Sequence, residues 1–163
     1  MKIRLQLSQP CTEEHLMIGI SSSMTDYQLS YFLNKSFQTQ FKKQPDITFY
    51  NKKGAIGSFP FYHFYGEDLR MDYYFFGNKA NETIAIPNYK SFEFFILFRL
   101  SSYSIPVDEI LKEMRQISKI QAALQIPLST LKNLPEILED IELHLLDISS
   151  TQKKRELSHW LWQ

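Results

Sequence analysis

Residues 84–100 read IAIPNYKSFEFFILFRL, and this stretch decides the predicted fold. From Phe92 onward, large apolar side chains occupy alternate positions, as on one face of a β-strand: Phe92, Phe94, Ile96, Phe98 and Leu100. Phe95 and Leu97 add two more on the opposite face. A strand with this pattern is buried on one side and partly covered on the other. We therefore predict a central strand here, with Phe94 and Ile96 in the core.

The segments on either side predict an α+β domain. Alternating or short apolar runs favour strands at 2–7, 47–50, 59–65, 71–76 and 119–126, and the short run 15–20 is either a strand or the lead-in to a helix. Helical spacing of apolar residues favours helices at 24–37, from Pro106 to 117, and at 134–148, although the IELHL run within 134–148 also fits a strand. We expect one antiparallel or mixed sheet of about six strands, covered by helices on one face. The single domain spans 1–148, and residues 151–163 form a C-terminal tail with a short docking helix.

Three local details of these elements are specific enough to check. Ser23 to Asp26 has the spacing of a capping box and predicts the start of the first helix. That helix should bury Leu29, Phe32, Leu33 and Phe37. In the last predicted strand Ile120, Ala122, Leu124 and Ile126 should share the buried face, and Ser149 to Thr151 should break the last long helix.

Composition fits a globular protein of ordinary size. The chain has 163 residues, with 44% hydrophobic and 22% charged residues, which suits one domain with a sizeable core. Aromatic residues make up 15% of the chain, including thirteen Phe and nine Tyr. They indicate an aromatic core, or an exposed aromatic surface for a ligand or partner. The N-terminus lacks a signal-peptide pattern and no apolar run is long enough to span a bilayer, so we expect a cytoplasmic protein.

Charge is balanced overall but unevenly distributed. Eighteen basic residues match eighteen acidic ones, so no global field attracts nucleic acid or membranes. The segment 35–53 is basic, and Lys42, Lys43, Lys52 and Lys53 lie among aromatic residues. Such a mixture can bind phosphate or single-stranded nucleic acid, although a solvated surface explains it as well.

The sequence lacks the motifs of known catalytic and cofactor sites. Cys11 is the only cysteine, which excludes an internal disulfide and a cysteine zinc cluster. Nucleophile-elbow, zinc-protease, dinucleotide and Walker patterns are absent. His63 has no metal-ligand spacing around it and is interpreted as a partly buried aromatic residue. We predict no catalytic residue, no cofactor and no metal site, and we leave enzymatic activity open.

Residues 86–94, IPNYKSFEF, resemble the signature of the IPExxxVDY family of small Bacteroidota proteins. Ile86 and Pro87 match that signature, Asn88 replaces its Glu, and its Val-Asp-Tyr triplet corresponds to Phe92, Glu93 and Phe94. The segments 19–37 and 77–87 are also similar to the family. The resemblance implies no activity, because none is assigned to the family.

The tail contains both tryptophans of the chain, Trp160 and Trp162. Each can bury a large surface, so we expect them to pack on their own sheet or on a second copy. Four function classes follow from the sequence. They are a non-catalytic interaction module that binds a protein partner or a second copy of itself, a domain that binds a small ligand or an acyl chain, a weak nucleic-acid or phosphate binder, and an enzyme with scattered site residues. The first is favoured.

Overall fold

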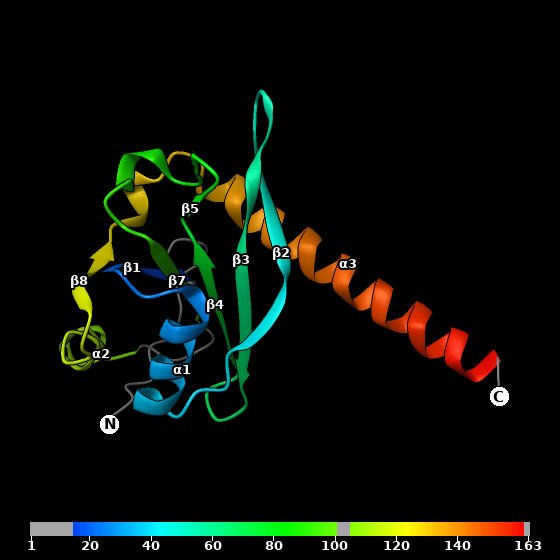
Figure 1. The fold of residues 1–163 in the computed structure, drawn as a ribbon, viewed down its shortest axis with the longest axis horizontal. Helices are drawn as coiled ribbons and strands as arrows, with labels where there is room; N and C mark the ends of the chain where they lie inside the picture. Colours follow the sequence, from blue (N-terminus) through cyan, green and yellow to red (C-terminus); the bar gives the residue numbers. More distant parts are fainter. Residues whose placement is uncertain (1–14, 101–104, 162–163) are drawn as a thin grey trace.

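A computed structural model describes residues 15–100 and 105–161 and shows an α+β domain built on one six-stranded sheet (Figure 1). The strand order is β2-β3-β4-β7-β1-β8, and all neighbouring pairs are antiparallel. The strands of this sheet are β1 (His15–Ser22), β2 (Lys42–Asn51), β3 (Gly54–Gly66), β4 (Met71–Gly77), β7 (Phe94–Arg99) and β8 (Ile120–Ile126). A small ribbon is formed by β5 (Lys79–Ala80) and β6 (Thr83–Ile84).

Three α-helices and two short 3-10 turns complete the fold. The α-helices are α1 (Asp26–Phe37), α2 (Val107–Met114) and α3 (Leu134–Leu161). The 3-10 turns are η1 (Pro87–Tyr89) and η2 (Leu128–Thr130). Helix α3 has 28 residues and extends beyond the rest of the molecule (Figure 1). The predicted strand at 2–7 lies outside the described residues.

Strand β7 lies inside the sheet, between β4 and β1, as the sequence predicts. Phe94, Ile96 and Phe98 belong to one core cluster, and Ile96 is only 2% exposed. Phe95 and Leu97 are completely buried in a second cluster on the opposite face. The predicted core position of Phe94 and Ile96 is confirmed. Phe92 precedes the strand and packs in the second cluster, not the first.

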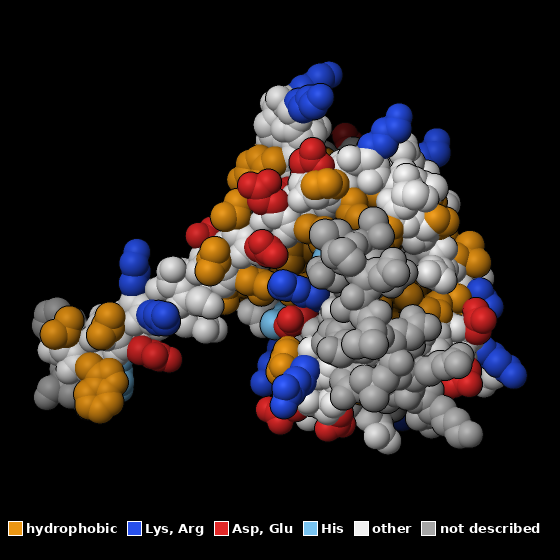
Figure 2. All heavy atoms as spheres, turned by 180° about the vertical axis from the view of Figure 1, so that it is seen from behind, with side chains coloured by type: hydrophobic (Ala, Val, Ile, Leu, Met, Phe, Trp, Pro, Cys, Tyr) orange, Lys and Arg blue, Asp and Glu red, His pale blue; other side chains and the backbone are white. Residues whose placement is uncertain are grey.

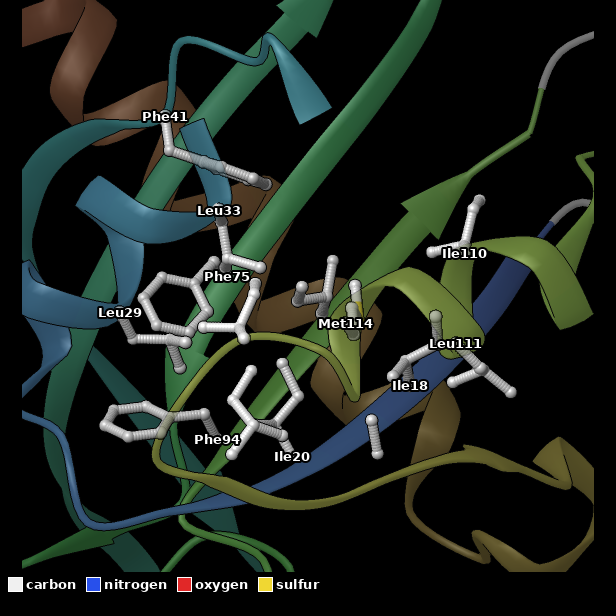
Figure 3. Packing of buried hydrophobic residues seen from close by; sticks show 14 of the residues in the cluster. Ile18, Ile20, Leu29, Leu33, Phe41, Phe75, Phe94, Ile110, Leu111 and Met114 are labelled. Carbon is white, nitrogen blue, oxygen red and sulfur yellow. The ribbon is translucent and has the colours of Figure 1, made fainter. Parts of the chain in front are cut away.

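Helices cover both faces of the sheet, so the expectation of one covered face is wrong. Helices α1 and α2 contribute five side chains to the first cluster (Figure 3): Leu29, Leu33, Ile110, Leu111 and Met114. Helix α3 contributes Ile137 and Ile141 to the second cluster. Because β7 is apolar on both sides, burial of either face alone would leave large side chains in water.

The N-cap of helix α1 is Thr25, two residues after Ser23, the first residue of the predicted capping box. The Thr25 hydroxyl accepts a hydrogen bond from the Gln28 amide, and the Gln28 side chain accepts one from the Thr25 amide. Leu29 and Leu33 then face the sheet, four residues apart. Phe32 is rotated away from them and is 39% exposed, which corrects its predicted burial.

Strand β8 also departs from its predicted alternation. Ser21 pairs with Ala122 and Ser22 pairs with Ile120, so Gln121 is an extra residue in the ladder. The extra residue reverses the alternation of side chains, so Ile120 and Ala123 lie on the same face of the sheet. Ala123 is therefore completely buried, whereas Leu124 is 48% exposed.

The expected helix break at 149–151 does not occur, because α3 is continuous there. The Thr151 hydroxyl donates a hydrogen bond to the Asp147 carbonyl, so this polar side chain is satisfied within the helix. The tail therefore extends a long helix and is not a separate one.

Asn78 holds the connection between β4 and β7. It is completely buried, and its side-chain amide donates to the carbonyls of Tyr89 and Phe92, at 3.0 and 2.9 Å. Its side-chain oxygen accepts from the Ile86 amide at 2.8 Å, and its carbonyl accepts from the Ala85 amide at 2.8 Å. One side chain thus fixes the loop that carries the IPNYKSFEF stretch.

We expect Asn78→Ala to lower the free energy of unfolding by about 3 kcal/mol, because two buried backbone groups and one partly buried group lose a partner, at roughly 1 kcal/mol or more each. Asn88→Ala, in the exposed part of the same loop, should change it by less than about 0.5 kcal/mol. Urea denaturation of both variants measures the difference. Equal stability of the two would contradict this role for Asn78.

Candidate functional site

Helix α3 is attached to the sheet by its first half. Ile137 and Ile141 are buried, and Asp140 accepts a hydrogen bond from the Tyr50 amide of β2 at 3.0 Å. The ring Nε2 of His144 donates to the Pro45 carbonyl at 2.8 Å. Burial raises the pKa of Asp140, the Tyr50 amide lowers it, and the nearby carboxylates of Glu139 and Glu136 raise it further. These contacts fix the direction in which α3 leaves the sheet.

The second half of α3 extends away from the sheet, and every residue from 149 to 161 is exposed (Figure 1). Large apolar side chains are nevertheless exposed both before this segment and within it: Leu143 and Leu146 before it, and Leu157, Trp160 and Leu161 within it. The exposed fractions are 64% for Leu146, 63% for Leu157 and 75% for Trp160. Hydrophobic side chains are visible at the far end of the projecting helix in Figure 2.

These side chains follow the spacing of a coiled-coil seam. Steps of three and four residues connect Leu143, Leu146, Ser150, Lys153, Leu157 and Trp160, which we call the α3 stripe. Four of its six members are large and apolar. Ile137 and Ile141 lie on the opposite side of the helix, so the stripe faces away from the sheet. The stripe is therefore a candidate interaction surface that the domain itself does not cover.

The structure places Trp160 in this stripe, and Trp162 lies outside the described residues. Trp160 is 75% exposed and does not pack on its own sheet, so the predicted intramolecular docking does not occur for this residue. Sequence analysis identified the tryptophans but missed Leu143, Leu146 and Leu157. These three leucines also have helical spacing, but the prediction used the other apolar stripe of the helix, which includes Ile137 and Ile141.

The four predicted basic residues do not form one patch. Lys42 and Lys43 begin β2, whereas Lys52 and Lys53 lie in the turn after it, about 30 Å away along a ten-residue strand. Lys43 is also engaged by its neighbours. Its ammonium lies 2.8 Å from Asp26 Oδ2, 3.9 Å from Asp46 and 5.1 Å from the centre of the Tyr62 ring. This arrangement disfavours a continuous nucleic-acid track.

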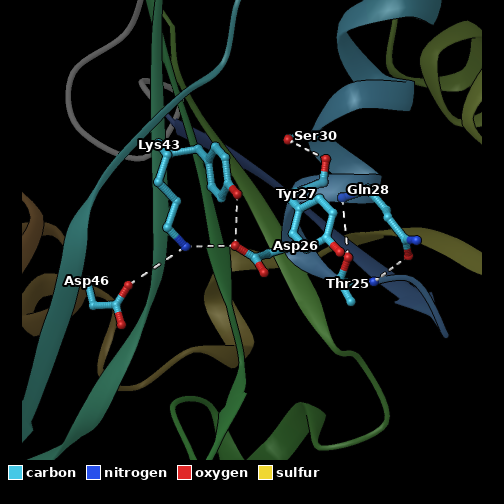
Figure 4. Close-up of polar contacts among 8 residues, drawn as sticks. Thr25, Asp26, Tyr27, Gln28, Ser30, Lys43 and Asp46 are labelled. Carbon is cyan, nitrogen blue, oxygen red and sulfur yellow. Dashed lines mark hydrogen bonds and ion pairs between the residues drawn. The ribbon is translucent and has the colours of Figure 1, made fainter.

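Asp26 connects the first turn of α1 to β2 and β3 (Figure 4). It accepts hydrogen bonds from Lys43 and from the Tyr62 hydroxyl, both at 2.8 Å. Burial acts to raise the pKa of Asp26, but the hydrogen bonds and the charge of Lys43 outweigh burial and lower it. Burial and the bond to Asp26 raise the pKa of Tyr62 well above its ordinary range. The cluster therefore joins helix to sheet, and its polar groups are occupied.

We expect Asp26→Asn to lower the free energy of unfolding at pH 7 by about 1 kcal/mol, since hydrogen bonds to a half-buried charge are lost. Because the pKa is lower in the folded state, this contribution is complete above the ordinary value of 3.8 and disappears as the pH falls through the folded value. The difference between wild type and variant should therefore shrink below about pH 4. Asp46→Asn, which removes only the more distant partner of Lys43, is the matched control. A difference that stays constant down to pH 2 in denaturation curves would contradict the assignment.

The residues of the IPExxxVDY-like stretch have structural positions. Ile86, Phe92 and Phe94 are buried, and exposed Pro87 begins η1. Glu93 accepts a hydrogen bond from the Ser22 amide at 3.0 Å and lies 3.4 Å from the Lys79 ammonium. The side chains of these signature residues line neither the pocket between α1, α2 and the sheet nor the hollow beside β5 and β6, and their contacts stabilise the loop and β7.

His63 is partly buried, as predicted, and it has a partner that the sequence did not reveal. Its Nε2 lies 2.8 Å from Asp72 Oδ1, and its ring stacks on Tyr74. The two residues are on β3 and β4, so only the pairing of the hairpin brings them together. Among the described residues, no hydroxyl or thiol is hydrogen-bonded to His63, and no group of three potential ligands could hold a metal ion. The pair therefore links the two strands of the hairpin.

A pocket of about 330 Å³ lies on the first face of the sheet, between α1, α2 and strands β3, β4 and β7. Its walls are mainly apolar and include Leu33, Phe41, Tyr73, Phe98 and Met114. Gln38, Thr39 and Asp68 provide polar groups at its boundary. Its size is at the lower end of the range of small-molecule sites.

Comparison of the chain with protein-family models, with curated proteins and with solved structures finds no match. Within the described residues, no helix has the length and apolar character needed to cross a membrane.

Proposed function

We propose that this protein is a non-catalytic interaction module that self-associates through the α3 stripe. One observation supports the proposal above the others: a helix attached to the domain carries two exposed pairs of large apolar side chains, Leu143 with Leu146 and Leu157 with Trp160, on one side at heptad spacing. Scattered exposed apolar residues are ordinary, but a row at heptad spacing is typical of a helix that packs on another helix. The cytoplasmic location and the membership in the IPExxxVDY family belong to this proposal as well.

The stability of the projecting half of α3 also favours self-association. Residues 149–161 are all exposed, so the burial of apolar side chains in the domain does not stabilise this half of α3. The ordered first half of α3 removes the cost of nucleating this segment, but packing on a partner would stabilise it further. Covering Leu146, Leu157 and Trp160 would remove several hundred Å² of surface from water per copy, at roughly 25 cal/mol per Å².

We expect the wild-type protein to form dimers and Leu157→Glu to weaken them by roughly a hundredfold or more, because each dimer loses two buried leucines and gains two carboxylates in an apolar seam. Ser158→Glu adds the same charge one residue away, off the stripe, and is the matched control. Sedimentation or light scattering under reducing conditions, which exclude a disulfide through Cys11, measures the association. A wild-type protein that is monomeric at about 100 μM would reject self-association.

The pocket favours a second candidate function, the binding of a small apolar molecule such as an acyl chain. Its mainly apolar walls and few polar boundary groups are typical of such sites. We expect a fluorescent fatty acid to bind the wild type, and Met114→Trp, which fills the pocket, to lower its affinity by about tenfold or more. Leu124→Trp, at an exposed position of β8, is the control and should bind as the wild type does. Equal binding by Met114→Trp would exclude this pocket.

A further inference from the structure

The α3 stripe is nearly symmetric when its direction is reversed. Its centre lies between Thr151 and Gln152, and reversal exchanges Leu143 with Trp160, Leu146 with Leu157 and Ser150 with Lys153. A second copy turned end to end would therefore place apolar side chains against apolar ones at both ends of the seam. The two polar positions would meet in the middle.

We propose that two copies of the chain pair their α3 helices in this antiparallel register, with Asp147 of each copy beside Lys154 of the other. The inference rests on the proposed self-association and adds its direction, its register and its charge contacts. The seam from Leu143 to Trp160 is about 25 Å long. Because the stripe faces away from Ile137 and Ile141, pairing breaks no contact between α3 and the sheet.

The charges beside the stripe favour this register. Asp147 and Lys154 both follow a stripe position on the same flank, Leu146 and Lys153 respectively. In an antiparallel pair the residues of this flank face one another across the two-fold axis. Each Asp147 then faces a Lys154 of the second copy, and symmetry makes the contact twice. Both residues are exposed in the single chain and so accessible to a partner.

A parallel pair would bring like charges together. Lys153 would face Lys153 of the second copy within the seam. Across the flanks, Glu142 would face Asp147, two carboxylates. The antiparallel pair has neither repulsion, and it places the two sheets at opposite ends of the helix pair. Polar Ser150 and Lys153 at the centre weaken the seam but fix its register, as single polar positions do in coiled coils.

Charge reversal distinguishes the two directions. In the antiparallel register Asp147→Lys places lysine beside Lys154 at two contacts, so dissociation should become roughly tenfold easier. Lys154→Glu should have a similar effect, and the double variant Asp147→Lys/Lys154→Glu should restore wild-type affinity. In a parallel pair Asp147→Lys would instead face Glu142 and tighten the dimer. Arg155→Glu changes charge as Lys154→Glu does, but on the face of α3 away from the stripe, and should leave affinity unchanged.

The outcomes separate this inference from the proposed function. A dimer that Leu157→Glu disrupts, but that Asp147→Lys leaves unchanged or tightens, overturns the antiparallel register and keeps self-association. A dimer that the double variant does not restore overturns the Asp147–Lys154 contact. A monomeric wild type overturns both proposals. If that monomer also bound phosphatidylserine vesicles in a manner that Leu157→Glu abolished, the stripe would be assigned to a membrane surface instead.

Discussion

The two-sided apolar character of β7 is the constraint on which the rest of the structure depends. Phe94, Ile96 and Phe98 need cover on one face of the sheet, and Phe95 and Leu97 need it on the other. Helices α1 and α2 cover the first face, and helix α3 and the loop that Asn78 fixes cover the second. An aromatic content of 15% fits this arrangement, because two separate clusters have to be filled across a single sheet.

Elements whose signal is local could be predicted from the sequence. The central strand, the β3–β4 hairpin and the helices α1 and α2 each have a period or a turn that few other structures share. The errors occur where the pairing of strands determines which way a side chain faces or which residue it contacts. The extra residue at Gln121 exists only relative to Ser21 and Ser22, and the partner of His63 lies across a hairpin. No periodicity within one strand contains that information.

Helix α3 shows the same limit for the candidate site. Its sequence carries two apolar stripes, one that includes Ile137 and Ile141 and one that runs from Leu143 to Trp160. Both satisfy helical spacing, and sequence alone does not say which of them meets the sheet. The prediction of a break at 149–151 followed from choosing the first stripe, which ends there. The structure shows that the helix continues and that its apolar surface moves to the other side.

This change of side connects the core to the proposed function. The first half of α3 is ordered by its burial against the sheet, so it serves as a formed helix from which the second half can propagate. Adding residues to an existing helix avoids the unfavourable nucleation step, and the projecting half can therefore be helical before any partner binds. A partner that meets a preformed stripe has less conformational entropy to remove than one that must order a flexible tail. Burial of the second face of β7 orders the first half of α3, and the projecting half that we assign to self-association extends from it.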